Sequence, residues 1–313
     1  MFRSLYDFLF GSPNVDAFTT KEPRPKVAYK YTSAHWLESI VRDGMFAFPG
    51  VDQLNDPHES AFDANFESLL SEATIPRSTG DARERELIQV RFGHVNDWFE
   101  NPYAEKNLQA RLERERDALK TKNDQIRQTN RMREKARSVL IHARQNIGVL
   151  SLTRHRCDVL MWAHYGQNSS GVCVGVDLSH PSIASYVSKV PAWEKMDDIF
   201  RPQSIVYRHT VPRYAVADTA QVIKAAFFSK SEAWKYEEEV RVLRPTVGCD
   251  AVSKDGVAIF RLPLSAISEV LVGNAVSRET MELVKRLAAE SSTTKFFRVE
   301  ASGSTYDLQI RPF

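Results

Sequence analysis

The chain has 313 residues, of which 42% are hydrophobic and 26% charged, as is typical of a folded globular protein with a large core. Its formal net charge of +2 gives no strong reason to expect that the whole molecule binds nucleic acid. No stretch approaches the length of a membrane span, and three widely spaced cysteines are typical of a reducing cytoplasm rather than of a disulfide framework.

The beginning of the chain predicts a short series of elements. Residues 1–25 combine an aromatic-rich start with a loop rich in Pro, Thr and Lys, and we interpret them as an arm and linker rather than a signal peptide. The alternating segment Lys26–Tyr31 predicts a strand. A helix from Ser33 to Gly44 is expected, because Ser can cap its start and Gly its end. A short strand at Met45–Phe48 and a turn at Asn55–Pro57 follow.

Residues 66–146 differ in character from the rest. Apolar residues become sparse there, and between 104 and 145 basic residues outnumber acidic ones by roughly two to one. Leu112, Leu119 and Ile126 recur every seven residues, but the stripe they form is too narrow for a buried helix. We predict a charged helical hairpin inserted into the main domain, which could mediate self-association or contact with a partner.

The remainder predicts strands and helices in irregular order. Strands are expected at 147–152, 171–178, 204–207, 256–262, 267–272, 296–300 and 306–310, and helices at 158–165, 219–228 and 278–289. This order favours an α+β fold in a single domain over residues 26–313. No G-x-G-x-x-G or Walker motif opens a helix after a strand, so Rossmann and P-loop folds are not expected.

The most informative segment is the W-x-x-E-x-E-x-R pattern that ends at Arg241. On an extended backbone Glu237, Glu239 and Arg241 share one face. Ionised groups are costly to bury unless they are paired or contact a ligand, so the row indicates a site. One carboxylate could accept a ribose hydroxyl proton and stabilise a developing positive sugar centre while the other orients the attacking group, and the arginine could hold a phosphate. The alternative is an exposed edge strand with salt bridges.

Two aromatic clusters are further candidates. Trp162, His164 and Tyr165 end a short predicted helix, where they could stack on a base or donate to a ribose. Tyr29 and Tyr31 point the same way on their strand and could line a cleft with their hydroxyls toward a ligand. Both clusters could equally be parts of a packed core.

Metal and serine-hydrolase chemistry find little support. His155, Cys157, His164 and Cys173 lie close in sequence, but without the C-x-x-C or H-x-x-x-H spacing that zinc sites use. Ser151 is not part of a G-x-S-x-G elbow. We therefore expect no metal.

Several motifs, in order, make the chain resemble the bacterial DUF2971 family of unknown function. They are the Y-K-Y strand at Tyr29–Tyr31, the N-D-P turn at Asn55–Pro57, the helix and strand at Leu160–Gly166 and Gly171–Cys173, the K-x-x-x-W-x-x-E-x-E-x-R segment at Lys230–Arg241, and the strand Glu269–Gly273. The charged stretch at 104–145 looks like an insertion relative to that family.

The layout of these motifs is also similar to that of ADP-ribosyltransferases. The similarity implies two small mixed or antiparallel sheets flanked by helices, with NAD bound as a substrate between them. It also implies transfer of ADP-ribose to water or to a protein or nucleic-acid acceptor, as in a toxin or phage-defence effector. This is an analogy at the level of fold.

The similarity also implies roles for individual residues. Glu239 would stabilise the oxocarbenium-like transition state, Glu237 would orient the acceptor, and Tyr29 or Tyr31 would hold the nicotinamide ribose. Ser151-Leu152-Thr153 or Tyr165 would support the nicotinamide ring. With Tyr165 grouped among the catalytic residues, the expected nucleotide-binding set is Tyr29, Tyr31, Ser151, Trp162, His164 and Arg241.

Two other functions remain open from the sequence. The chain could be a nucleic-acid- or nucleotide-binding protein in which the basic helical segment contacts phosphates, and its binding would then depend steeply on salt. It could also be a non-enzymatic module that binds a partner through that segment.

Overall fold

A computed structural model describes residues 25–56, 137–188, 197–210 and 219–313, with isolated helical positions between 113 and 134. The chain divides into two compact units, one of residues 1–62 with 139–313 and the other of residues 63–138. The predicted arm and most of the predicted helical insertion lie outside the described residues, although residues 137–146 are helical. No helix among the described residues is long and apolar enough to cross a membrane.

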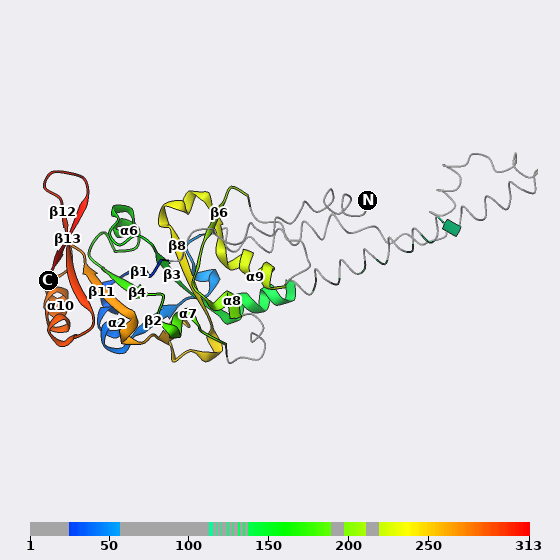
Figure 1. Cartoon of the computed structure of the whole chain (residues 1–313), viewed down its shortest axis with the longest axis horizontal. Helices are drawn as coiled ribbons and strands as arrows, with labels where there is room; N and C mark the ends of the chain where they lie inside the picture. Colours follow the sequence, from blue (N-terminus) through cyan, green and yellow to red (C-terminus); the bar gives the residue numbers. More distant parts are fainter. Residues whose placement is uncertain are drawn as a thin grey trace, which may run out of the picture. The chain divides into compact units, whose positions relative to one another are not determined.

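The first unit is built around a wide mixed sheet (Figure 1). Its strands, in spatial order, are β13 (Leu308–Pro312), β12 (Lys295–Ala301), β11 (Ile267–Val272), β4 (Val172–Asp177), β1 (Val27–Thr32), β3 (Ile147–Thr153), β8 (Glu239–Pro245) and β5 (Gln203–Ser204). Within this sheet only β11 and β12 run parallel to each other. Two smaller sheets join β2 (Met45–Phe48), β10 (Ala258–Arg261) and β9 (Ala251–Val252), and β6 (Val206–Arg208) with β7 (Ser229–Ser231).

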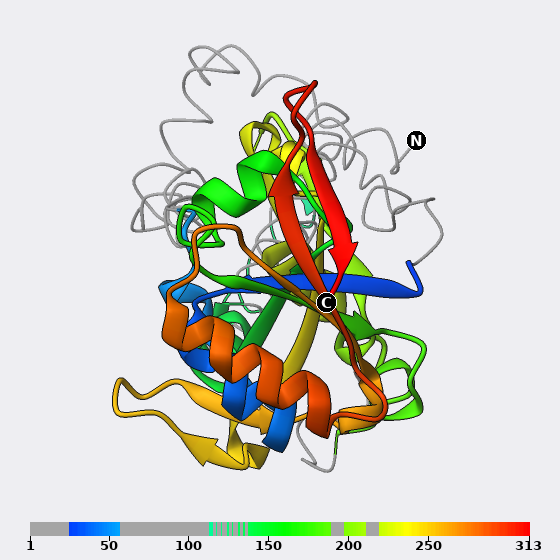
Figure 2. The same cartoon turned by 90° about the vertical axis from the view of Figure 1, so that its left-hand side faces the viewer.

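Helices cover both faces of the sheet (Figures 1 and 2). They are α2 (Leu37–Asp43), α6 (Val159–His164), α7 (Pro181–Ala184), α8 (Asp197–Phe200), α9 (Thr219–Phe228) and α10 (Arg278–Glu290). Short 3-10 turns lie at Ala34–Trp36, Val51–Gln53, Glu232–Glu237, Thr246–Gly248 and Leu264–Ala266. Because side chains alternate along a strand, the sheet presents a different apolar surface on each side.

The larger core lies on the side of α2 and α10. It joins Leu37 and Ile40 of α2 and Leu287 of α10 to alternate residues of the central strands, such as Val174 and Val242. The smaller core lies beneath α6 and joins Tyr29, Tyr31, Met161, Trp162, Cys173, Leu271 and Val299. Tyr29 and Tyr31 are thus core residues on the α6 side, and the residues that alternate with them face the other way.

The predicted α+β class is confirmed, but the arrangement of the sheets differs from the pair of small sheets that was expected. β1 joins β4 on one side and β3 on the other, so one continuous eight-stranded sheet results. Whether two distant strands share a sheet depends on long-range hydrogen bonds, which local patterns do not reveal.

The sheet nevertheless opens between β1 and β3. β1 pairs with β4 over its whole length, from Val27 to Thr32, but with β3 only where Tyr29 lies opposite Thr153. Beyond this point the segment after β2, instead of β1, pairs with the edge of β3, where Val149 N donates to Pro49 O (2.9 Å). A gap therefore forms inside the sheet, and it matters for the site.

The expected continuous strand through Glu237, Glu239 and Arg241 is wrong at its start. Glu237 ends a 3-10 turn, and Glu238 adopts a left-handed conformation with φ 42°. β8 therefore begins only at Glu239. The left-handed residue breaks the alternation, so Glu237 reaches its partners from a turn rather than from the face of a strand.

Gly273, which follows β11, is expected to be intolerant of a side chain. An ideal Cβ there would lie 2.1 Å from the carbonyl oxygen and 2.7 Å from the carbonyl carbon of Ser169, and both atoms belong to the backbone. Gly273→Ala should therefore lower the free energy of unfolding by about 1–3 kcal/mol. Urea titration measures the change. Gly303→Ala, where nothing lies within 4 Å of the new Cβ, is the control; equal stability of both variants would contradict the close approach.

Candidate functional site

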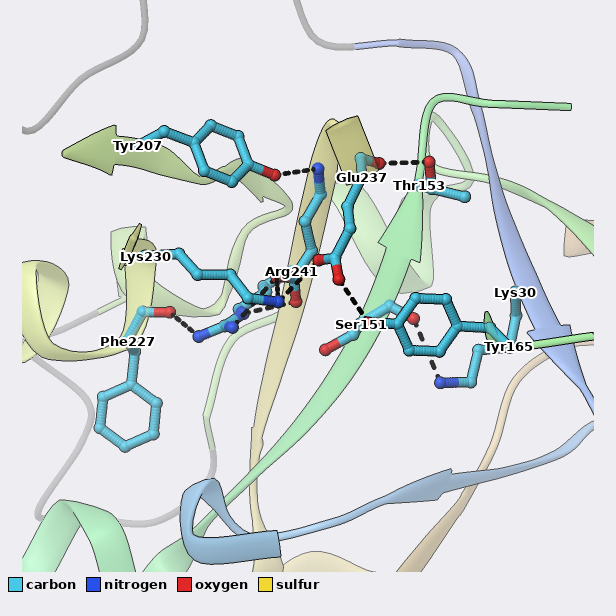
Figure 3. Close-up of polar contacts among 10 residues, drawn as sticks. Lys30, Ser151, Thr153, Tyr165, Tyr207, Phe227, Lys230, Glu237 and Arg241 are labelled. Carbon is cyan, nitrogen blue, oxygen red and sulfur yellow. Dashed lines mark hydrogen bonds and ion pairs between the residues drawn. The ribbon is translucent and has the colours of Figure 1, made fainter. Parts of the chain in front are cut away.

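A cavity of about 200 Å³ opens where β1 leaves β3. Four separate segments supply its polar groups, namely β1, the turn after β2, β3 with α6, and the stretch from β7 to β8. Its polar and charged lining consists of Tyr29, Lys30, Tyr31, Gln53, Asn55, Ser151, Thr153, Tyr165, Lys230, Glu237, Glu239 and Arg241. Figure 3 shows the central contacts.

Glu239 is the most tightly held carboxylate of the cavity, with a side chain that is only 4% exposed. Arg241 Nε donates to one of its oxygens (2.7 Å) and an Arg241 Nη to the other (3.1 Å), which Lys230 Nζ also contacts (3.2 Å). Burial alone would raise the pKa of Glu239, but the charges of Arg241 and Lys230 outweigh it and lower the pKa to about 2. Glu239 is therefore ionised at neutral pH.

Glu237 enters the cavity from the end of the 3-10 turn. Lys230 Nζ donates to one oxygen of its carboxylate (2.6 Å), and the Tyr165 hydroxyl donates to the other. The backbone oxygen of Glu237 accepts a hydrogen bond from Thr153 Oγ1 (2.5 Å). Two residues further on, the backbone N of Glu239 donates to the Tyr207 hydroxyl (2.8 Å). Hydrogen bonds to side chains thus hold the backbone at both glutamates of the E-x-E pattern.

The four buried charges of Glu237, Glu239, Lys230 and Arg241 balance. Burial disfavours the charged form of Lys230, but the two carboxylates outweigh it and raise its pKa. Arg241 also donates to Phe227 O at the end of α9 (2.6 Å). Four buried charges are costly to desolvate, and the removal of any one of them leaves another without its partner.

Four aromatic rings lie near Glu237 and Lys230. Trp234 and Tyr236 have ring centroids 6.3 Å apart, and His164 lies 6.0 Å from Tyr236 and 6.4 Å from Tyr165. His164 is exposed and the other three rings are partly exposed. Lys230 Nζ lies 4.8 Å from the centroid of Trp234. These four rings, His164, Tyr165, Trp234 and Tyr236, are called the aromatic rim below.

The structure brings most of the predicted site residues together. Those that line the cavity are Tyr29, Tyr31, Ser151, Tyr165, Glu237, Glu239 and Arg241. Trp162 does not, because it is buried in the smaller core with its ring edge-on to Tyr31 at 5.0 Å. His164 belongs to the rim rather than to the cavity.

The expected direction of the tyrosine hydroxyls is wrong. The Tyr29 hydroxyl donates to Glu269 Oε1 (2.9 Å). Arg156 also donates to this carboxylate, at both of its oxygens. Tyr31 donates to His155 O (3.2 Å) and accepts from Asp158 N (3.2 Å). These hydroxyls secure the segment before α6, so they are occupied within the protein.

Lys230, Asn55 and Lys30 are among the cavity residues that were not predicted. Lys230 belongs to the K-x-x-x-W-x-x-E-x-E-x-R pattern, and that spacing was the signal that could have found it. Asn55 contacts the Tyr165 hydroxyl, although the N-D-P motif indicated only a turn. Lys30 lies between the two tyrosines, and alternation alone placed it on the opposite side from them.

The cavity offers carboxylate, ammonium, guanidinium and hydroxyl groups. Among the residues that the structure describes, no group of three or more His, Cys, Asp or Glu side chains is placed to hold a metal ion. The same residues can contact a sugar and a phosphate, because carboxylates accept from hydroxyls and Lys and Arg donate to anions.

Loss of the Tyr165 hydroxyl is expected to weaken the site measurably. Tyr165→Phe should reduce the free energy of unfolding by about 1–2 kcal/mol, because a hydrogen bond to the Glu237 carboxylate disappears. Chemical denaturation provides the measurement. Tyr306→Phe serves as the matched control, since Tyr306 is fully exposed at 102%; an equally small effect in both would show that the contact contributes little.

Comparison with known proteins gives one match. Residues 161–242 match the family described as "Protein of unknown function (DUF2971)", and no curated protein and no solved structure matches significantly. The matched segment runs from α6 to β8 and includes Tyr165, Lys230, Glu237, Glu239 and Arg241. This segment is therefore similar to the DUF2971 family, as its motifs indicated.

Proposed function

We propose that this protein is an ADP-ribosyltransferase-like enzyme that binds NAD at the cavity and cleaves its N-glycosidic bond. The observation that carries the proposal is the convergence of two buried carboxylates, Glu237 and Glu239, on one cavity inside an opened sheet. A purely structural role would be served as well by apolar residues of similar volume.

The two carboxylates suit different tasks. Glu239 stays ionised and is held at both oxygens, so it can stabilise positive charge on the ribose without rearranging. Glu237 shares its oxygens with Lys230 and the Tyr165 hydroxyl, so it can orient the hydroxyl of an acceptor. Lys230 and Arg241 hold the two carboxylates in place, and their positive charges partly cancel the negative potential of those carboxylates.

The reaction itself is balanced without another reagent. The bond between ribose C1′ and the nicotinamide nitrogen breaks, and its electron pair neutralises the pyridinium. Water or a hydroxyl of a macromolecule then bonds to C1′ and loses a proton to the medium. The products are nicotinamide and either ADP-ribose or an ADP-ribosylated acceptor.

The size of the cavity limits which part of NAD it can hold. Cavities for drug-sized ligands measure about 300–1,000 Å³, and this one measures about 200 Å³. We therefore place the nicotinamide and its ribose inside. The phosphate that adjoins this ribose would lie beside it in the gap between β1 and β3, and the adenosine would extend past the aromatic rim, where a base can stack.

Release of nicotinamide from NAD tests the proposal. Glu239→Gln should reduce the rate at least about 100-fold, since removal of one preorganised electrostatic group commonly has this effect. Glu238→Gln is the matched control, because that carboxylate lies between the other two in sequence but is 53% exposed; its rate should equal that of the wild type. Absence of release from the wild type, with water or with protein and nucleic-acid acceptors, would contradict the proposal.

A second candidate is a nucleotide-binding protein without NAD chemistry. The observation that favours it is that Glu237 and Glu239 are already fully paired with Lys230 and Arg241. It predicts that NAD raises the melting temperature equally in the wild type and in Glu239→Gln, with no nicotinamide released.

A further inference from the structure

We infer that Lys30, the central residue of the Y-K-Y strand, binds a phosphate oxygen of the ligand in the cavity. The inference rests on the proposed function in placing a nucleotide there. It adds that the recognised part of the substrate is its phosphate and that Lys30 recognises it.

The position of Lys30 follows from the opening of the sheet. Tyr29 and Tyr31 turn into the smaller core, so Lys30 points away from them. Its Nζ reaches across the gap to Ser151 O on β3 (3.3 Å; Figure 3), at the edge that β1 has left. Lys30 therefore lies in the gap between the two strands and lines the cavity.

The hydrogen bonds of Lys30 leave room for a ligand. A lysine ammonium has three donors, and within the described ranges the contact with Ser151 O is the one that the structure shows for it. Lys230, in contrast, lies within 3.2 Å of two carboxylates. No carboxylate in the described part of the chain lies within ion-pair distance of Lys30.

The charge balance of the cavity points to an anion. Lys230 and Arg241 already match the two carboxylates, so a protonated Lys30 is a surplus positive charge. Burial lowers the pKa of Lys30, and the more distant charge of Glu239 opposes this only in part. A bound phosphate would supply the missing countercharge and two or more acceptor oxygens.

A structural role for Lys30 is the competing explanation. Its ammonium could simply satisfy the backbone oxygen of Ser151 at the open edge of β3. Such a role needs a donor but no charge, so glutamine could fill it. Phosphate recognition needs the charge, and this difference decides the experiment.

Binding of ADP and adenosine, measured by calorimetry, separates the two roles. Lys30→Met and Lys30→Gln should each weaken ADP binding about 10–100-fold, as expected for a lost charge-assisted contact, and should change adenosine binding less than about twofold. Lys30→Arg should retain most of the preference for ADP. Lys26→Met, at an exposed lysine next to the same strand, should bind both ligands like the wild type.

The other outcomes have definite meanings. Equal losses for ADP and adenosine, wild-type affinity in Lys30→Gln, or no preference of the wild type for ADP would each overturn the inference. Competition by inorganic phosphate that depends on Lys30 would support it and show that phosphate alone suffices. Because no turnover is measured, a Lys30-dependent preference for ADP without nicotinamide release would refute only the proposed NAD cleavage.

Discussion

Arg241→Met should lower the free energy of unfolding by about 3–5 kcal/mol. The Arg241 side chain is 1% exposed and holds both oxygens of Glu239. Methionine fills much of the same space but leaves a carboxylate buried with Lys230 as its remaining charged partner. The loss is therefore mainly the cost of an incompletely paired ion rather than of lost packing.

Urea unfolding of three variants tests this explanation. Arg311→Met removes an arginine that is 64% exposed and pairs with Glu300 at 3.0 Å, and it should cost at most about 1 kcal/mol. The double variant Arg241→Met with Glu239→Gln should be more stable than Arg241→Met alone, because no ion is stranded. A double variant that is less stable than the single one would show that packing, not charge, dominates.

Acid should remove a contribution to stability that depends on Glu239. Its pKa is about 2 in the folded protein against an ordinary value of 4.5, so its ionised form is favoured by folding. The contribution is fully present above about pH 4.5 and is lost as the pH falls toward 2. It amounts to about 3 kcal/mol, of which about 2 kcal/mol should be gone at pH 3.

Comparing the wild type with Glu239→Gln isolates this term. Between pH 7 and pH 3 the wild type should lose about 2 kcal/mol more unfolding free energy than the variant, because all other carboxylates titrate in both. Glu238→Gln, at the neighbouring exposed position, is the control and should follow the wild type. Identical pH dependence in the wild type and Glu239→Gln would contradict the lowered pKa of Glu239 in the folded protein.

The charged cluster is also an argument about function. A buried set of two ion pairs adds little stability compared with apolar residues of the same volume. Here the set borders an open cavity rather than solid core. The arrangement makes physical sense if the carboxylates act on a ligand, and the variants above then measure how much stability is given up for that purpose.

Local patterns were enough to find most of the secondary structure. The helix at 219–228 and the strand at 267–272 were predicted with the bounds that α9 and β11 have. The helix that ends at Gly44 was also expected, and Gly44 does adopt the left-handed conformation that stops it. Periodicity, caps and turn residues act within a few positions, so a sequence displays them directly.

Side-chain partners were predicted less well, for a physical reason. The E-x-E-x-R pattern did mark a charged site, because such residues are rarely buried without a purpose. It did not reveal that Glu238 would adopt a left-handed rather than an extended conformation. That conformation depends on the 3-10 turn that precedes Glu238. Nor could it show that Lys230 would join both carboxylates, because the 3-10 turn that follows β7 brings Glu237 and Glu239 back to that residue.

The sequence by itself determined the α+β class, the similarity to DUF2971 and the acidic motif, since each depends on residues close together along the chain. The tertiary structure alone decided that β1 separates from β3, that the tyrosine hydroxyls turn to Glu269 and His155, and that Lys30 enters the gap. Those outcomes depend on which distant strands pair and over how many residues they do so. Contacts between residues more than a hundred positions apart place Tyr29, Lys30 and Tyr31.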